Sequence, residues 1–395
     1  MPFHTRTVHF PAYAGHFPGA PLVPGAALLT ALDDLVLAVT GTRLGRLGRV
    51  RFLGPVVPGE AITLRVGVIT ASPEGDNVSL SALRAEGGEV VLRGVGWSAP
   101  RMVSGSGMAA VLRSEPRLAS PVWGGHRLAA AYNKGADPTA RIGESWEVWR
   151  DNLVLPPDGP EGAPRRLGEV VDLPLLIKLL DTEEVLSVQV HPDDAAARRL
   201  EGAPNGKAEG WVILAAAPGA RIAYGLTRAL SADELRARAM SGEIAEDLAW
   251  IEVVPGDVID VPPGTIHAIG GGILLYEIQQ PADLTYRLYD HGRGRELHLD
   301  KAVAVARREV RRPVSTPRTL GPGHTELLRN GVFVVERIEV PAATRWIGER
   351  PAAFTVVEGE IRIGVETVRR GESVVVTEGA WPLAGHGVAL VGREA

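Results

Sequence analysis

The first hundred residues carry one helical pattern followed by several strand patterns. From residue 24 to residue 40, leucine and valine fall on several sides of a helical repeat, which predicts a largely buried helix. The runs that follow show the period-two alternation typical of strands, at residues 49–53, 61–70, 77–86 and 89–98. We therefore expect a buried helix wrapped by an antiparallel sheet.

Strand patterns punctuated by proline and glycine dominate the chain after about residue 173. Helical patterns interrupt them at residues 231–248 and 299–308. Ser231 followed by Glu234 is a capping-box sequence, in which each residue satisfies a backbone N–H of the first helical turn. This part of the chain is expected to be mainly β, with a small helical insertion.

One sequence frame occurs twice, about a hundred residues apart. The first copy runs from Gly256 to His267, and the second runs from Gly371 to Pro382 with the same glycine spacing. The frame resembles the second conserved motif of the cupin family, whose double-stranded β-barrels bind a metal at one end. The resemblance implies two barrels. Because Pro382 replaces the histidine in the second copy, only the first barrel is expected to bind metal.

A small, flexible run at residues 101–107, RMVSGSG, divides the chain and reads as a linker or a fusion joint. The expected organisation is an N-terminal domain at residues 1–100, a linker at 101–112, a metal-binding cupin domain at 113–312 and a degenerate cupin domain at 313–395. Whether the SGSG–Met junction is natural stays open at this point.

The amino-acid composition indicates in which compartment the protein functions and which classes of partner it can have. The chain has 395 residues and no cysteine, so disulfides and thiolate metal sites are excluded and a reducing cytoplasm is expected. The net charge of -5 carries no basic stripe, which argues against a nucleic-acid partner. The chain has neither a signal-peptide start nor an apolar run of about 20 residues, so no membrane partner is expected.

Four residues form the candidate metal site: Gln189, His191, Glu209 and His267. Gln189 and His191 lie two apart along an apparent strand, so both side chains point to the same face. A single histidine in a strand is more often a packing residue than a ligand, and it is the combination that favours a metal. Nitrogen and oxygen donors of this kind suit one Zn²⁺ per chain, with Fe²⁺, Co²⁺ and Mn²⁺ left open.

An ordered set of motifs gives the resemblance its specificity. The motifs are PVWGG at 121–125, GESWEV at 143–148, LLIKLLD at 175–181, SVQVHPDD at 187–194, KAE at 207–209, VPPGTIHA at 261–268, YEIQQ at 276–280, TYRLYD at 285–290 and RELH at 295–298. Over about residues 113–395 the chain resembles the type I mannose-6-phosphate isomerases, particularly their short bacterial form.

This resemblance implies zinc at His191, Glu209 and His267, and Gln189 matches a ligand of longer family members. Arg287 falls on the family's catalytic arginine. Lys178 and Lys207 match positions near the substrate, where we expect Lys178 to bind substrate and Lys207 to take part in catalysis.

Interconversion of an aldose and a ketose needs a base near the reacting carbon and positive charge for the developing enediolate. The metal and Arg287 would supply charge, and Glu277 is the candidate base. A structural ion pair is the equally weighted alternative for Glu277. The tryptophans Trp123, Trp146 and Trp211 are taken as core residues by default, although they could line a sugar site.

The N-terminal residues carry a second resemblance. HFPGAPLVPG at 16–25 and RFLGPVVPGE at 51–60 are similar to the hotdog-fold β-hydroxyacyl-acyl carrier protein dehydratases, over about residues 5–100. His16 keeps the family's histidine, but its acidic partner position falls on Thr30, which cannot do a carboxylate's acid–base work. Dehydration would then need Asp33 or Asp34 as a substitute.

Three classes of function follow from these features. The first is a metal-dependent isomerase of mannose 6-phosphate and fructose 6-phosphate, acting on a small sugar phosphate. The second is a dehydratase or a thioester-binding protein whose partner is an acyl carrier protein or an acyl thioester. The third is a non-catalytic sugar-binding cupin. Because hotdog domains generally pair through their sheets, a binding or dimerisation module and a homodimer are favoured for the N-terminal domain.

Overall fold

The computed structural model describes seven stretches of the chain, residues 3–10, 22–40, 44–70, 77–98, 110–154, 164–308 and 317–395. The chain divides into two compact units, Met1–Met108 and Ala109–Ala395. The structure is mainly β, as expected from the sequence. Among the described helices, none is both long and apolar enough to cross a membrane.

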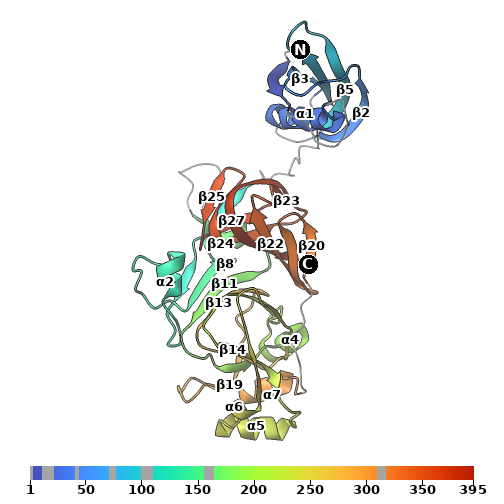
Figure 1. Ribbon diagram of the computed structural model, residues 1–395. Helices are drawn as coiled ribbons and strands as arrows, with labels where there is room; N and C mark the ends of the chain where they lie inside the picture. Colours follow the sequence, from blue (N-terminus) through green and yellow to red (C-terminus); the bar gives the residue numbers. More distant parts are fainter. Residues whose placement is uncertain are drawn as a thin grey trace. The chain divides into compact units, whose positions relative to one another are not determined.

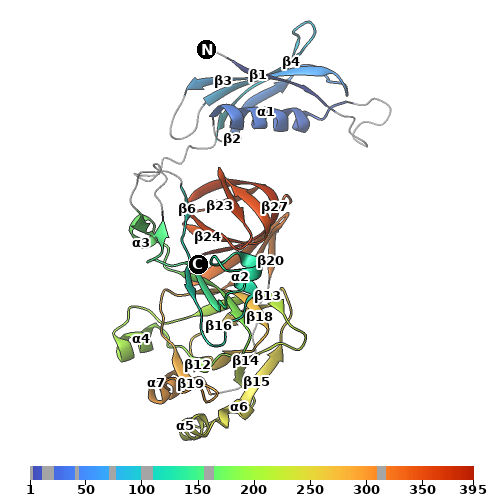
Figure 2. The same cartoon turned by 90° about the vertical axis from the view of Figure 1, so that its left-hand side faces the viewer.

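The N-terminal unit is an antiparallel sheet with one long helix, α1 (Gly25–Thr40), lying along it (Figure 2). The strand order is β1-β3-β4-β5-β2. The strands are β1 (His4–His9), β2 (Leu44–Phe52), β3 (Ala61–Thr70), β4 (Asn77–Arg84) and β5 (Val90–Ser98). Leu28, Leu32 and Val36 of the helix are buried in one core with Leu64 and Val66 of the sheet, because burial of both apolar faces stabilises this pairing. The predicted hotdog arrangement is confirmed.

In the C-terminal unit, two facing sheets form a first barrel. The larger has the order β16-β13-β18-β11-β8-β7, with β7 (Arg117–Ala119), β8 (Glu144–Val148), β11 (Leu176–Thr182), β13 (Glu209–Ala216), β16 (Val258–Val261) and β18 (Ile273–Gln279). The smaller has the order β15-β14-β17-β12-β19, with β12 (Val188–Val190), β14 (Arg221–Leu226), β15 (Leu248–Glu252), β17 (His267–Ile269) and β19 (Tyr286–Tyr289). Trp211, Leu275 and Ile222 share the apolar core between these sheets.

Helices gather at one end of this unit, next to β19 and β14 (Figure 1). They are α4 (Asp194–Glu201), α5 (Ala232–Ser241), α6 (Ile244–Asp247) and α7 (Leu299–Val305). Their apolar side chains, among them Leu235, Ile244 and Val303, form one core with Val188 and Leu288 of the small sheet. The smaller elements of the unit are α2 (Arg127–Tyr132), α3 (Leu167–Val170), β9 (Leu153–Val154) and β10 (Arg165–Arg166).

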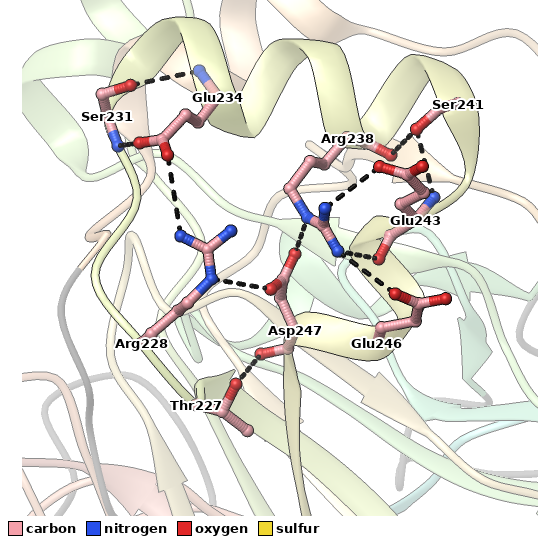
Figure 3. Close-up of polar contacts among 9 residues, drawn as sticks. All are labelled: Thr227, Arg228, Ser231, Glu234, Arg238, Ser241, Glu243, Glu246 and Asp247. Carbon is pink, nitrogen blue, oxygen red and sulfur yellow. Dashed lines mark hydrogen bonds and ion pairs between the residues drawn. The ribbon is translucent and has the colours of Figure 1, made fainter.

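The predicted helix at residues 231–248 is divided in two. The capping box at its start is confirmed, with Ser231 and Glu234 bonded to each other's backbone N–H (Figure 3). Gly242 then ends α5 in the left-handed conformation at φ 83°, which glycine adopts without a Cβ penalty. The buried Asp247 of α6 accepts from Arg228 and Arg238, which joins the two helices (Figure 3). The second predicted helix, at 299–308, ends earlier than expected, at Val305.

The second barrel is formed by a nine-stranded sheet with the main order β20-β21-β22-β27-β24-β26-β6. Its strands are β6 (Val111–Arg113), β20 (Arg318–Gly321), β21 (His324–Arg329), β22 (Phe333–Val340), β23 (Arg345–Gly348), β24 (Ala352–Ile363), β25 (Glu366–Arg369), β26 (Ser373–Val376) and β27 (Gly379–Glu394). Residues 111 and 112, expected in the linker, belong to β6 because they pair with β26.

The interior of the second barrel is packed with Trp346, Phe354 and Trp381. Pro382, at the position of the first barrel's histidine, lies in β27 opposite Arg345. A separate core between the barrels joins Tyr276 and Ile278 of β18 to Phe333 and Val335 of β22, together with Leu390 of β27. The first barrel is thereby supported on one side by the second.

Candidate active site

Both sheets of the first barrel contribute to one cluster of His191, Glu209 and His267. His191 follows β12 directly, Glu209 is the first residue of β13, and His267 is the first residue of β17. His191 Nε2 lies 3.2 Å from Glu209 Oε1, and His267 Nε2 lies 3.6 Å from Glu209 Oε2. One ligand atom from each residue lies within 4.8 Å of the others. Three side chains separated by up to 76 residues in sequence thus converge on one point.

Backbone carbonyls orient both imidazoles toward this point. His191 Nδ1 donates to Leu284 O at 2.8 Å, and His267 Nδ1 donates to Thr265 O at 2.9 Å. With Nδ1 carrying the proton, each Nε2 presents its lone pair to the cluster, which is the usual arrangement of metal-binding histidines. His191 Nε2 and both Glu209 oxygens are buried without a well-directed hydrogen bond. The imidazole nitrogen and Glu209 Oε2, buried without a hydrogen bond, are suitable ligand atoms for a divalent cation, whereas Oε1 also faces the Lys207 ammonium.

Gln189 lies beside the three residues, as its spacing from His191 predicted. It stands opposite His267 in the pairing of β12 with β17. Its amide nitrogen lies 3.2 Å from His267 Nε2. The structure therefore brings all four candidate metal ligands together, while their role as ligands stays a prediction.

The charges around the cluster favour the protonation states that metal ligands require. Burial alone would raise the pKa of Glu209, but the Lys207 ammonium at 2.6 Å and the two imidazoles hold that pKa well below its usual range. Burial lowers the pKa of His191, and it lowers the pKa of His267 to about 3, with the neighbouring imidazole adding to the effect. A carboxylate and two neutral imidazoles result.

A cavity of about 210 Å³ opens beside the cluster. Gln189 and Lys207 line it and connect it with the candidate metal ligands. Lys178, Glu277 and Arg287, the remaining candidates from the sequence, also line it. One polar cavity therefore holds the predicted catalytic and substrate-binding residues.

Glu277 and Lys178 face each other across β18 and β11. Lys178 Nζ lies 3.4 Å from Glu277 Oε1 and 3.8 Å from Glu144 Oε2. Trp211 Nε1 donates to the other Glu277 oxygen at 3.1 Å. Burial and the negative charge of Glu209 raise the pKa of Glu277, while Lys178 opposes this rise. Glu277 thus forms an ion pair with Lys178 and also has a raised pKa. It therefore remains a candidate both for the catalytic base and for a structural ion pair.

Arg287 lies on β19, next to Gln189 in the pairing with β12. Its guanidinium donates from NH1 to the backbone oxygen of Glu296 at 2.7 Å, while its Nε is buried without a hydrogen-bond partner. Burial lowers the Arg287 pKa, and the nearby Arg295 lowers it further. Because this guanidinium bonds to one neutral carbonyl through NH1, its other N–H groups can donate hydrogen bonds to a ligand in the cavity.

The sequence reasoning missed several residues that line the cavity. Trp146, taken as core by default, lines it together with Glu144 and Arg295, and Trp123, which is buried in the core as expected, also contributes to the lining. Glu144 and Trp146 lie two apart on β8, so strand alternation within the GESWEV motif could have placed them on one face. Trp211, in contrast, is fully buried core.

The N-terminal unit provides a separate cavity of about 490 Å³ beside α1. Thr30 lines it and donates from its hydroxyl to Ala26 O at 3.0 Å within the helix. Asp33 accepts from the Leu44 backbone N–H at 2.7 Å, whereas Asp34 lines the cavity. His16 lies outside the described residues. Of the two possible substitutes for the missing acid, Asp34 is the one placed at the cavity.

Two cupin barrels with a His–Glu–His cluster beside a polar cavity define a metal-site cupin. Residues 163–210 match the family model of the phosphomannose isomerase type I catalytic domain. The chain is 33% identical over 299 residues to a mannose-6-phosphate isomerase of Streptococcus mutans, in an alignment that covers 68% of this chain and 93% of that protein. The chain belongs to the mannose-6-phosphate isomerase family.

Further similarities extend to solved structures. The mannose 6-phosphate isomerase from Bacillus subtilis matches with a TM-score of 0.63 and 27% identity, covering 72% of this chain and 99% of that one. A zinc-bound mannose 6-phosphate isomerase shares the fold, with a TM-score of 0.59 at 15% identity over 72% of this chain and 100% of that one.

The N-terminal unit has its own relatives. Residues 5–91 match the family model of the ApeI-like proteins, described as ApeI dehydratase. A 3-hydroxyacyl-[acyl-carrier-protein] dehydratase FabZ of Chlamydia trachomatis is 31% identical over 99 residues, or 22% of this chain and 63% of that protein. The predicted similarity to hotdog dehydratases is confirmed.

Proposed function

We propose that the protein is a metal-dependent isomerase that interconverts mannose 6-phosphate and fructose 6-phosphate through an enediol. The observation that carries this proposal is the buried His191–Glu209–His267 cluster beside a cavity lined by Lys178, Glu277 and Arg287. Family membership supports the same substrate. A non-catalytic sugar-binding cupin would not need a carboxylate of raised pKa in its cavity.

Zn²⁺ is the proposed metal, one ion per chain, held by His191, Glu209 and His267 with Gln189 as a fourth ligand. Two imidazoles, a carboxylate and an amide match the donor types of catalytic zinc sites. When bound, the ion supplies a Lewis acid that stabilises negative charge on the substrate oxygens. The zinc-bound structure of a protein with this fold supports the choice.

The surrounding residues supply the remaining chemistry. Glu277 takes the proton from the hydroxyl-bearing carbon next to the carbonyl and returns it to the former carbonyl carbon, while the proton of that hydroxyl passes to the former carbonyl oxygen. A carboxylate of raised pKa suits this role because it is a stronger base than an ordinary one. Arg287 orients the sugar and adds positive charge where the enediolate develops. Lys207, which lines the same cavity beside Glu209, takes part in catalysis, and Lys178 donates to sugar hydroxyls.

Metal removal and restoration test this function. Protein treated with a chelator should lose conversion of mannose 6-phosphate to fructose 6-phosphate, and added Zn²⁺ should restore it in proportion to bound metal. Parallel loading with Co²⁺, Mn²⁺ and Fe²⁺ identifies the metal that supports turnover. A metal-saturated protein that binds the sugar phosphate but never converts it would instead be a sugar-binding cupin.

For the N-terminal domain predicted at residues 1–100, we infer a binding and dimerisation module rather than a dehydratase. Thr30 occupies the acid position and bonds to its own helix backbone. The cavity beside α1 is lined mostly by apolar and small side chains, which suits an acyl thioester or an acyl carrier protein's acyl group. A homodimer in the cytoplasm is the proposed state, with a linker that ends before β6 at Val111, a catalytic domain that follows it up to residue 312 and a degenerate barrel at 313–395.

Three measurements test this second proposal. Light scattering should give a dimer for the full chain. The protein should bind a crotonyl thioester without hydrating it, and His16→Ala should leave that result unchanged. Hydration by the wild-type chain that disappears in His16→Ala would show instead that this domain is a dehydratase, and loss of that hydration in Asp34→Asn as well would identify Asp34 as the acid.

A further inference from the structure

Strand β8 presents side chains both to the active-site cavity and to the second barrel. Glu144 and Trp146 line the cavity. Ser145 and Glu147 alternate with them along the strand and are 0% and 1% exposed. Ser145 Oγ donates to Glu147 Oε1 at 2.5 Å, so these two side chains lie together on the face away from the cavity. The proposed chemistry gives no role to either of them.

The buried carboxylate of Glu147 joins the first barrel to the second. Its Oε1 lies 2.6 Å from Lys134 Nζ, and its Oε2 accepts from Ser373 Oγ of β26 at 2.9 Å. Lys134 also donates to the backbone oxygen of Gly371, where the second copy of the glycine frame begins. Both charges of the ion pair are buried, so the loss of one would leave the other uncompensated.

Gly371 allows the second barrel to approach the end of α2 at this point. Its φ is 87°, and a Cβ in its place would collide with the backbone oxygen of Tyr132, the last residue of α2. Gly256, its counterpart in the first copy of the frame, has a φ of 96°, but a Cβ there would meet no atom of the described residues within 4 Å. The second barrel therefore uses its copy of the frame for a contact between the barrels.

Glu147 is also the extra residue of a β-bulge. In the pairing of β8 with β11, Ile177 lies opposite Val148 and Lys178 lies opposite Trp146, which leaves Glu147 without a partner in this ladder. The pairing of β8 with β7 stops at Trp146. A bulge interrupts the ladder and changes the direction of neighbouring side chains. Here the second barrel bonds to the extra residue, and this fixes where the bulge lies.

The residue next to the bulge on β11 is Lys178, the proposed sugar-binding lysine. Its ammonium lies 4.7 Å from the centroid of the Trp146 ring and 3.8 Å from Glu144 Oε2. Trp146 Nε1 donates to the same Glu144 oxygen at 2.8 Å. A shift of β8 at the bulge would therefore displace two partners of Lys178 at once.

We propose that Glu147 is a positioning residue through which the second barrel fixes the β8 bulge and thereby places Lys178 for the substrate. This inference rests on the proposed isomerase function. It gives the second barrel a part in the active site, although that barrel carries Pro382 in place of a metal-binding histidine. The candidate metal ligands lie on or beside β12, β13 and β17, so loss of this contact should weaken substrate binding while the metal stays bound.

Glu147→Gln in the zinc-loaded full chain tests the inference, with Glu336→Gln as a matched control. Glu336 is 3% exposed, and its bonds run to His324, Trp346 and Arg393 within the second barrel. Both variants should lower the melting temperature. Only Glu147→Gln should raise KM for mannose 6-phosphate, by about 5- to 20-fold, with kcat changed less than about threefold and zinc content unchanged. A folding defect alone would reduce the fraction of active molecules, which lowers the apparent kcat and leaves KM as it is.

A double-mutant cycle with Lys178→Met shows whether Glu147 acts through Lys178. In the Lys178→Met background, Glu147→Gln should change KM by less than about twofold, because the side chain that it positions is absent. Two KM effects that simply multiply would overturn the inference. So would a Glu147→Gln variant that matches Glu336→Gln, with a lower melting temperature and an unchanged KM.

Ser373→Ala is the second variant should Glu147→Gln not fold, as judged by circular dichroism. It removes the donor that the second barrel supplies and keeps the ion pair with Lys134, so KM should rise about two- to fivefold. An unchanged KM in folded Ser373→Ala would contradict the proposed positioning. Failure of the isomerase proposal looks different, because wild-type protein would then show no turnover. The dissociation constant for mannose 6-phosphate, measured by calorimetry, replaces KM in that case, and a wild-type chain that neither converts nor binds this sugar would remove both proposals.

Discussion

Lys207 Nζ lies 2.6 Å from Glu209 Oε1, and both side chains are almost completely buried. The ammonium keeps Glu209 ionised in a site where burial alone would favour its protonated form. It therefore prepares a carboxylate for a metal ion, although it also adds positive charge beside that ion. This pair makes Glu209 the residue whose loss should have the clearest consequence.

Glu209→Gln should abolish metal binding and isomerase activity together. The amide keeps the shape of the side chain but removes the negative charge, and it leaves Lys207 buried without its counter-charge. We expect bound zinc, measured by atomic emission, to fall in step with kcat. Glu201→Gln is the control, because Glu201 pairs with Lys301 at 2.8 Å outside the cavity lining and should retain metal and activity. Full zinc content in Glu209→Gln would remove Glu209 from the ligand set.

Arg287→Gln should lower kcat while the metal stays bound. Its guanidinium lines the cavity, with Nε buried, and is proposed to stabilise the enediolate, so its removal should cost about 10²–10³ in kcat, as for other preorganised donors. Steady-state kinetics beside zinc analysis distinguishes this result from loss of the site. If kcat changed by less than about threefold and only KM rose, Arg287 would be a binding residue and not a catalytic one.

Glu277→Gln separates the base from the ion pair. A base should lose about 10²–10⁴ in kcat on this change, whereas a residue that only positions Lys178 should lose far less. The comparison variant is Lys178→Met, which removes the same ion pair and keeps the carboxylate. Equal effects of the two variants would identify the ion pair as the important feature.

The acid limb of the pH profile gives independent evidence on Glu277. A base acts in its ionised form, so kcat/KM should fall as pH drops through its pKa. Because burial and Glu209 raise that pKa, the fall should begin above the pH expected for an ordinary glutamate. If the residual activity of Glu277→Gln showed the same acid limb as the wild type, that limb would arise from the titration of another group.

The sequence predicted much of this site because its residues lie in short motifs with fixed spacing. Gln189 and His191 two apart, and the glycine frame ending at His267, each placed a side chain on a known face of a strand. The spacing did not show how deep His267 lies: it begins β17 and is fully buried. Spacing gives the face of a strand, whereas depth depends on the sheets packed around it.

Other features depend on contacts distant in sequence. Arg295 comes to Arg287 through the turn after β19, and no local pattern reports that approach. Val111 and Leu112 looked like linker because β6 is only three residues long and gains its stability from pairing with β26, more than 260 residues later. Element boundaries of this kind are set by tertiary partners.

The second barrel offers a test of stability that is independent of catalysis. Glu336 is 3% exposed and bonds to His324 at 2.9 Å, to Trp346 Nε1 at 2.9 Å and to Arg393 at 2.8 Å. Burial would raise its pKa, but these partners lower the pKa from 4.5 to about 2. A carboxyl group with a depressed folded-state pKa stabilises the fold above its unfolded pKa, and this contribution, about 3 kcal/mol, is lost as pH falls from 4.5 toward 2.

Glu336→Gln should therefore lower the melting temperature of the chain at pH 7, and the difference from wild type should shrink below pH 4.5. A neutral amide does not compensate the charge of the partly buried Arg393. The loss of stability at pH 7 therefore arises both from the missing negative charge and from a guanidinium left without its ion pair. Thermal unfolding followed by circular dichroism between pH 3 and pH 7 measures it, with Glu360→Gln as the control because Glu360 forms an exposed pair with Arg369. A Glu336→Gln difference that stayed constant over this pH range would show that shape, and not charge, accounts for the stability of this cluster.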